Sequence, residues 1–261
     1  DLAHQFGVVL GIVDLLAGAG DDAVAEAEGT GVLVGKGLDE EAWRKTLLAS
    51  ERGTIVRDAP LRIALCYPLP YHAAMSSLGF QVIYRLFNSR PGISCERVVL
   101  PDDVAAWRAR GLKPISLESG RPLADFDLVA VSMTWDLDLF GLFELLDLAG
   151  IPIRRDQRSG WDPAVLIGGP LTASNPLPLA DFIDFAVIGD GEVAVPKVLD
   201  AIEDAHDRDA LFDHLGAVSG VWIPERDGDR IPPTQKVTAG LPAYGQIVTP
   251  LSELSNILLV Q

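Results

Sequence analysis

Four loops of this sequence carry the residues most able to contact a ligand, and each loop follows a short apolar run. The first loop spans residues 68–79. Its candidate contact residues are Pro68, Tyr71, His72, Ser76 and Gly79. An imidazole can bind a metal ion, although a histidine that follows two prolines is more often a solvated loop residue. Gly79 permits the backbone to approach a ligand closely. We therefore expect ligand contacts in this loop.

The other three loops combine small hydroxyls with glycines. After the third run come Ser132, Met133 and Thr134, after the fourth Gly168, Gly169 and Pro170, and after the fifth Gly189, Asp190, Gly191 and Glu192. Hydroxyls donate and accept hydrogen bonds, and a pair of glycines lets a flat or bulky ligand lie against the backbone. We expect Met133 to be core filler beside the site.

Each loop by itself has a structural explanation, because glycines shape turns and small hydroxyls cap helices. Their joint placement is the stronger observation, since the carboxyl ends of parallel strands share one edge of a sheet, where ligands bind. The sequence has no dinucleotide fingerprint, no phosphate-binding P-loop, no G-x-S-x-G elbow and no Cys/His cluster. Dinucleotide, triphosphate, hydrolase and zinc sites are therefore disfavoured, and a large, nearly neutral ligand fits better.

The elements that position these loops alternate between strand and helix patterns. Apolar runs lie at residues 62–67, 95–100, 127–133, 164–167 and 185–188, with helical patterns between them at 75–87, 104–110, 138–149 and 192–204. Such alternation indicates parallel strands that are joined by helical crossovers. We predict an α/β fold with a Rossmann-like (flavodoxin-like), doubly wound, five-stranded parallel sheet of order 2-1-3-4-5.

The two ends of the chain have different patterns. Residues 1–52 predict a small helical appendage, with helices at 3–17, 22–28 and 40–50. Residues 53–206 form the predicted Rossmann-like domain. In residues 207–261 we expect a helix at 210–215, a hairpin at 220–231 turned by Asp227-Gly228, and a proline-bearing connector. Because the sequence begins with Asp1 and ends in a strand-like pattern, we expect an excised piece of a longer protein.

The composition excludes several classes of partner. Lys and Arg number 21 against 37 Asp and Glu, which gives a net charge of −16. This field repels nucleic-acid backbones and anionic lipid heads. The most apolar stretch, residues 6–20, contains Asp14 and is shorter than the roughly 20 residues of a membrane span. Cys66 and Cys95 lie in apolar runs and predict no disulfide framework. We expect a cytoplasmic protein without nucleic-acid or membrane partners.

Four short motifs occur in a specific order along the chain. They run from Tyr67-Pro68 to Gly79-Phe80-Gln81, over residues 117–123 (LESGRPL), over 167–170 (IGGP) and over 188–192 (IGDGE). Together they resemble the cobalamin-binding-domain radical S-adenosylmethionine proteins, across roughly residues 53–261. In that family a Rossmann-like cobalamin domain precedes a radical barrel that holds a four-iron four-sulfur cluster and S-adenosylmethionine. Residues 252–261 resemble the first strand of such a barrel, but no cluster cysteines follow.

The resemblance implies roles for three of the four loops. The backbone of Gly168 and Gly169 would lie along the dimethylbenzimidazole tail of cobalamin. The hydroxyls of Ser132 and Thr134 would form hydrogen bonds with that tail. The glycines of residues 189–191 would admit the edge of the corrin.

One family motif is absent. Many cobalamin domains carry D-x-H-x-x-G after the first strand, and its histidine replaces the cofactor's own base on cobalt. Counting back from Gly79 places Ala74 and Ser76 at the Asp and His positions. We therefore expect a displaced tail and no lower histidine ligand, with His72 as the one nearby residue that would contradict this.

The resulting prediction is a cobalamin-binding module of a radical S-adenosylmethionine enzyme, with its own downstream barrel as partner. The module itself would bind and orient the cofactor and would not be catalytic. One alternative is a flavodoxin-like domain that binds FMN or another small ligand, with Ser76 and Ser77 near a phosphate. A second alternative is a degenerate, cofactor-free docking domain.

Overall fold

The computed structural model describes residues 40–238 and 244–253. All described residues belong to one compact unit. The helices expected at 3–17 and 22–28, and most of the barrel strand expected at 252–261, therefore lie outside the described residues. The domain boundaries expected at residues 52 and 206 stay predictions.

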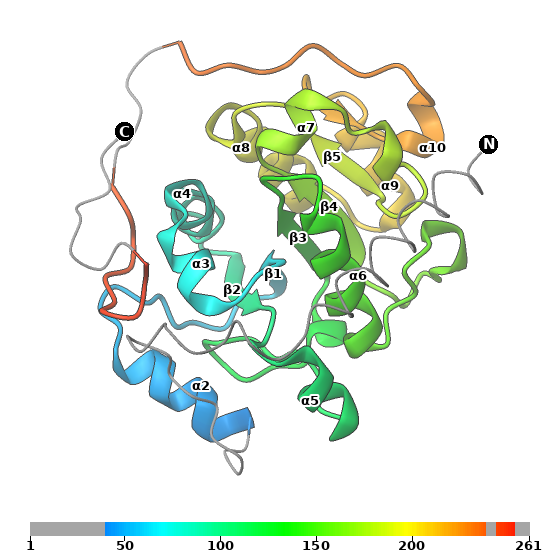
Figure 1. Ribbon diagram of the computed structural model, residues 1–261. Helices are drawn as coiled ribbons and strands as arrows, with labels where there is room; N and C mark the ends of the chain where they lie inside the picture. The colour runs from blue at the N-terminus through cyan, green and yellow to red at the C-terminus, as the bar shows by residue number, and fades with distance from the viewer. Residues whose placement is uncertain (1–39, 239–243, 254–261) are drawn as a thin grey trace. The chain divides into compact units, whose positions relative to one another are not determined.

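A six-stranded sheet forms the centre of this unit (Figure 1). In spatial order the strands are β2 (Ile93–Val99), β1 (Leu61–Tyr67), β3 (Leu128–Ser132), β4 (Ala164–Gly168), β5 (Phe185–Val187) and β6 (Val221–Trp222). Strands β1 to β5 are parallel, and β6 is antiparallel to β5. The α/β class and the predicted order 2-1-3-4-5 are confirmed.

The predicted sheet needs one correction, at its β5 edge. The sequence predicted five parallel strands and a hairpin over residues 220–231, whereas Val221 and Trp222 form a sixth strand that pairs with β5. The chain then turns into the short helix α10 (Pro224–Asp227). Proline favours the first position of a helix, and the Asp227 carboxylate accepts a hydrogen bond from the backbone N–H of Ile223 at 2.9 Å. The Asp-Gly pair therefore ends a helical turn and does not join two strands.

The helices expected within the described residues are present, but one of them is divided in two and the short helix after β4 was not predicted. They are α2 (Glu40–Ala49), α3 (Tyr71–Ser76), α4 (Leu78–Phe87), α5 (Val104–Ala109), α6 (Asp138–Ala149), α7 (Pro170–Ser174), α8 (Gly191–Glu203) and α9 (Arg208–Leu215), with 3-10 turns at Leu123–Asp125, Arg155–Gln157 and Leu177–Leu179. The single helix expected at 75–87 is two helices, because Ser77 is extended and its hydroxyl accepts the Phe80 N–H at 3.3 Å. Serine is a preferred N-cap residue, so α4 begins after it.

The helices cover both faces of the sheet. Side chains of a strand alternate between faces, so Ile63 and Leu65 of β1 pack with apolar residues of α2, α4, α8 and α9. Ala64 and Cys66 pack on the other face with apolar residues of α6 and α7. The strands are thus buried on both sides, as their mostly apolar sequences predict.

Candidate functional site

A cavity of about 740 Å³ lies at the carboxyl edge of the sheet. Its floor is formed by one aliphatic side chain from each of four neighbouring parallel strands: Leu65, Ala130, Leu166 and Val187. Helix α4 contributes Ile83 and Phe87 to the wall, and α8 contributes Val195. This volume lies within the range of roughly 300 to 1,000 Å³ that is typical of ligand pockets.

Two glycines leave open space at this cavity. A Cβ atom placed on Gly168 or on Gly79 would meet no atom within 4 Å, and neither glycine has a positive φ. Neither the packing nor the backbone conformation of the chain requires a glycine at these two positions. The missing side chains instead enlarge the cavity, as expected where a ligand lies against the backbone.

Gly169 and Gly189 have a different reason to be glycine. Gly169 has a φ of +105°, and a Cβ there would lie 2.4 Å from the backbone oxygen of Met133. Gly189 has a φ of +103°, and a Cβ there would lie 2.2 Å from the backbone oxygen of Gln235. Side chains rarely tolerate such φ values, so these two residues shape the loops around the cavity.

The loop between β3 and α6 presents hydroxyls to the cavity. The buried Asp138 carboxylate accepts hydrogen bonds from the backbone N–H groups of Thr134 and Trp135, at 2.6 and 2.9 Å. The Thr134 hydroxyl lies 3.5 Å from the Tyr67 hydroxyl. Ser132 lines the cavity, and its hydroxyl has no partner in the described part of the chain. The loop is thus held by its backbone, and the Ser132 side chain stays available to a ligand.

Residues 234–237 form one further wall, which we call the strap. The backbone N–H of Gln235 donates to the oxygen of Ile188, and the N–H of Asp190 donates to the oxygen of Gln235, both at 2.9 Å. The N–H of Val237 donates to the Asp190 carboxylate at 2.8 Å. The strap therefore lies directly against the loop that follows β5, and Lys236 is held between two anchored residues.

Ten of the fifteen predicted site residues line this cavity: Gly79, Ser132, Thr134, Gly168, Gly169, Pro170, Gly189, Asp190, Gly191 and Glu192. The other five do not. Met133 is fully buried, as a core filler should be. Pro68 packs against α6, where a Cβ on Gly141 would lie 2.0 Å from the backbone oxygen of Pro68.

The remaining three residues of the first loop have partners elsewhere. The Tyr71 hydroxyl donates to the carboxylate of Glu51 at 2.7 Å. The Ser76 hydroxyl donates to the backbone oxygen of His72 and accepts from the N–H of Glu253. The half-exposed His72 ring lies 3.8 Å from an Asp102 oxygen and 3.5 Å from a Glu253 oxygen. Of the first loop, the cavity is lined only by Gly79 and by Ser77, which was expected near a phosphate in the FMN alternative.

Sequence reasoning missed the floor of the cavity and the strap. The floor residues belong to apolar runs that the sequence marks only as buried strands. Ile83 and Phe87 belong to the helical pattern at 75–87, whose apolar positions do not reveal that these two side chains line a cavity. The only sequence signal for the floor is Ala130, a small side chain within a run of larger ones, which leaves space above the sheet.

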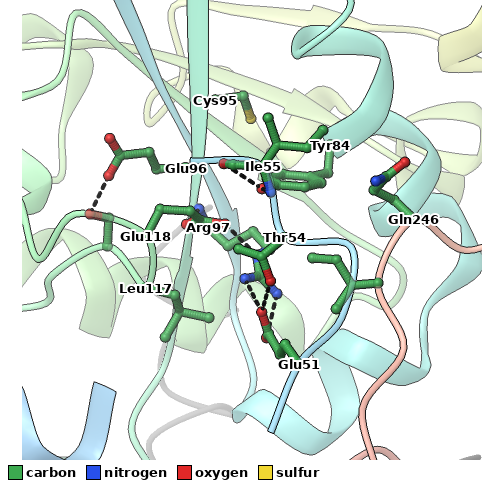
Figure 2. Close-up of polar contacts among 12 residues, drawn as sticks. Glu51, Thr54, Ile55, Tyr84, Cys95, Glu96, Arg97, Leu117, Glu118 and Gln246 are labelled. Atoms are coloured by element: carbon green, nitrogen blue, oxygen red, sulfur yellow. Dashed lines mark hydrogen bonds and ion pairs between the residues drawn. The ribbon is translucent and has the colours of Figure 1, made fainter. Parts of the chain in front are cut away.

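A second polar region lies on the same side of the sheet, around β2. Figure 2 shows the Arg97 guanidinium between two carboxylates, those of Glu51 and Glu118. Two nitrogens of Arg97 donate to Glu51, at 2.8 and 2.7 Å, and a third donates to Glu118 at 2.7 Å. All three side chains are at most 1% exposed. We call these three residues the ionic cluster.

Burial and pairing set the protonation of the ionic cluster. Burial alone would raise the pKa of Glu51, but the hydrogen bonds and charge of Arg97 lower that pKa below its ordinary value of 4.5. Burial raises the pKa of Glu118, and the charge of Arg97 offsets only part of the rise. The cluster has its partners within the protein and offers no open position to a ligand.

The described residues do not provide a metal centre. No group of three His, Cys, Asp or Glu side chains is placed to hold an ion among them. Cys66 and Cys95 are free and buried, and burial raises the pKa of both thiols, which disfavours the thiolate that binds metals. No helix in the described part of the chain is both long and apolar enough to cross a membrane.

A family model described as "Radical SAM proteins, N-terminal" matches residues 79–224, which is more than half of the chain. The chain belongs to this family. No curated protein matches the sequence. The family match begins at Gly79 and includes the loops after β3, β4 and β5, so most of the cavity lies within it. The strap lies beyond it. S-adenosylmethionine and an iron–sulfur cluster belong to radical SAM proteins in general, but the described residues do not fit a cluster site.

Proposed function

We propose that this chain is the cobalamin-binding module of a radical SAM enzyme, and that the cavity receives the nucleotide tail of cobalamin. One observation carries the proposal: a cavity of about 740 Å³ at the carboxyl edge, with Gly168 leaving open space on its wall. Family membership supports the enzyme class, and the position of the cavity in a Rossmann-like sheet supports a bound cofactor.

The residues present fit such a tail. Its flat aromatic base matches an aliphatic floor and walls made by Leu166, Ile83 and Val195. Its sugar and phosphate match hydroxyls such as that of Ser132, which has no partner among the described residues. When bound, cobalamin supplies cobalt chemistry. The cavity residues would hold the tail and exclude water from its base, and so would orient the cofactor.

No histidine lines the cavity in the described part of the chain. His72, the nearest candidate in sequence, faces Asp102 and Glu253 outside it. This placement supports a binding mode in which the base of the tail leaves cobalt and no histidine takes its place as the lower ligand.

An FMN-binding function has less support. It would need hydroxyls of the first loop to hold the phosphate, and Ser76 and Ser77 were the candidates. The Ser76 hydroxyl is engaged with His72 and Glu253, so only Ser77, which lines the cavity and accepts the Phe80 N–H, keeps an O–H that could be donated to a phosphate. A cofactor-free docking domain would give no cobalamin binding in the experiment below.

We also propose that the downstream radical barrel of the same protein covers this edge. The loop after β3 and the start of α6 expose three large apolar side chains: Trp135, Leu137 and Phe140 are 70%, 74% and 46% exposed. Large exposed apolar groups that lie close together are typical of surfaces that contact another domain. They follow directly after Thr134, which lines the cavity.

Equilibrium dialysis with methylcobalamin tests the proposal, with the wild type compared with Gly168→Leu. A leucine at this open position fills the cavity without meeting backbone, so we expect binding to fall by more than about tenfold while thermal unfolding is preserved. Gly160→Leu is the matched control, because a Cβ there also meets nothing within 4 Å and the residue does not line the cavity.

Equal affinity in wild type and Gly168→Leu would contradict the cavity as the binding site. No binding by the wild type would contradict the function itself and favour the docking domain. Gly189→Leu is unsuitable as a test, since its Cβ would clash with the strap at Gln235 and loss of binding would then reflect loss of structure.

A further inference from the structure

Lys236 is the one basic side chain among the described residues that line the cavity. The other charged side chains there are Asp190 and Glu192. Lys236 has no ion pair within the described chain, and the Asp190 carboxylate is engaged by the N–H of Val237 at 2.8 Å. Lys236 is thus an exposed, unpaired basic residue beside a cavity whose other charged side chains are acidic.

The position of Lys236 is fixed by its neighbours. Gln235 exchanges backbone hydrogen bonds with both Ile188 and Asp190, and Val237 is held by the Asp190 side chain. Gly189 has no side chain where the strap crosses it, and any Cβ there would collide with the backbone of Gln235. The backbone on both sides of Lys236 is thus anchored, and the lysine can reach only a limited volume at the cavity.

The positive charge of Lys236 can attract an anionic group of a ligand. The chain has a net charge of −16, and a field of that sign repels an anionic ligand. The nucleotide tail of cobalamin carries a phosphodiester with one negative charge. Methylcobalamin as a whole is neutral, so the lysine acts locally: an ammonium binds phosphate oxygens as a point charge, at a cavity whose other charged side chains are acidic.

We propose that Lys236 binds the phosphodiester of the cobalamin tail and so selects complete cobalamin over corrinoids that lack the nucleotide. This inference rests on the proposed function and adds a residue outside the family match, which ends at residue 224. Selection then comes from the strap, whereas the cavity that admits the base comes mainly from the family region.

The experiment compares two ligands with the same corrin and the same methyl group. Methylcobalamin carries the phosphodiester, and methylcobinamide lacks the whole nucleotide. We expect Lys236→Gln to weaken methylcobalamin binding about fivefold, as for loss of one charge-assisted hydrogen bond at an exposed site, and to leave methylcobinamide binding unchanged. Lys197→Gln is the matched control, because it removes an exposed positive charge on α8 that does not line the cavity.

The outcomes separate this inference from the proposed function. If the wild type binds methylcobalamin and Lys236→Gln binds it equally well, the inference is wrong and the function stands. If Lys236→Gln weakens both ligands equally, the lysine acts on the corrin or on the structure, and the inference is again wrong. If the wild type binds neither ligand, the proposed function fails and this inference fails with it.

Discussion

Helix α4 separates two regions that lie on the same side of the sheet. They differ in whether their polar groups have partners within the protein. Toward β2, the Tyr84 ring of α4 lies 5.2 Å from the Arg97 guanidinium of the ionic cluster. Toward β4 and β5, Ile83 and Phe87 of the same helix face the cavity. In the cluster the charged groups find buried partners within the protein.

The cavity has the opposite character. Ser132 and Lys236 line it without partners in the described chain, and Gly168 leaves space that no atom of the protein fills. The contrast between the ionic cluster and the cavity indicates that buried charge by itself does not mark a functional site. Completed polar networks stabilise a fold, whereas small residues and unpaired polar groups beside open space mark a place for a ligand.

The largest expected effect comes from removing the arginine of the ionic cluster. Arg97→Met leaves the carboxylates of Glu51 and Glu118 buried without a counter-charge, and we expect the free energy of unfolding to fall by about 3 to 5 kcal/mol. Urea denaturation measures this. Arg154→Met, which removes an exposed ion-paired arginine, should leave the midpoint nearly unchanged. A similar midpoint for Arg97→Met and wild type would show that the cluster does not stabilise the fold.

The next largest effect is a pH-dependent loss of stability when Glu51 is replaced. The folded pKa of Glu51 lies below its ordinary value of 4.5, so the unfolded chain binds more protons between these two values and stability rises with pH there. Glu51→Gln should cost about 2 kcal/mol at pH 7, and the gap to the wild type should shrink as pH falls below 4.5.

Urea denaturation between about pH 3 and pH 7 measures that gap. The exposed Glu225→Gln, which loses an ion pair with Arg155, serves as control and should differ little from wild type at each pH. A gap for Glu51→Gln that stays constant across the range would mean that ionisation of Glu51 does not contribute to stability.

The smallest expected effect concerns the cavity. Gly79 is an exposed glycine in the first turn of α4, and a Cβ there meets nothing. Gly79→Leu should raise the free energy of unfolding by up to about 1 kcal/mol, because leucine favours a helix more than glycine does. The same change should weaken methylcobalamin binding, since Gly79 lines the cavity.

Paired urea denaturation and equilibrium dialysis measure these two opposite changes. Gly160→Leu is again the control for binding. A Gly79→Leu variant that is more stable and binds methylcobalamin as well as the wild type does would place the ligand elsewhere.

The sequence was sufficient for the order of the five parallel strands, because each apolar run is short and each helical pattern between runs is distinct. It also placed the loops after β1, β3, β4 and β5 at one edge, where ten predicted residues line the cavity. The reason is general: parallel strands bring their carboxyl ends together, so loops far apart in sequence become neighbours once the strand order is known.

Long-range partners were not predictable from local patterns. Tyr71 was expected near a ligand, but its hydroxyl bonds Glu51, a residue of the segment before β1. The strap was expected only as a connector, because its backbone contacts with Ile188 and Asp190 join residues about 47 positions apart. The short β6 was assigned to a hairpin for the same reason, since two residues are too few to show a strand period.

The most direct test of the central claim is the absorption spectrum of methylcobalamin during titration with the wild-type chain, in the dark at neutral pH. If the cavity takes the nucleotide tail, the base leaves cobalt, and we expect a base-off spectrum that saturates at one equivalent of protein. A bound cofactor that keeps its base-on spectrum, or no spectral change at saturating protein, would contradict the assignment of the cavity to the tail.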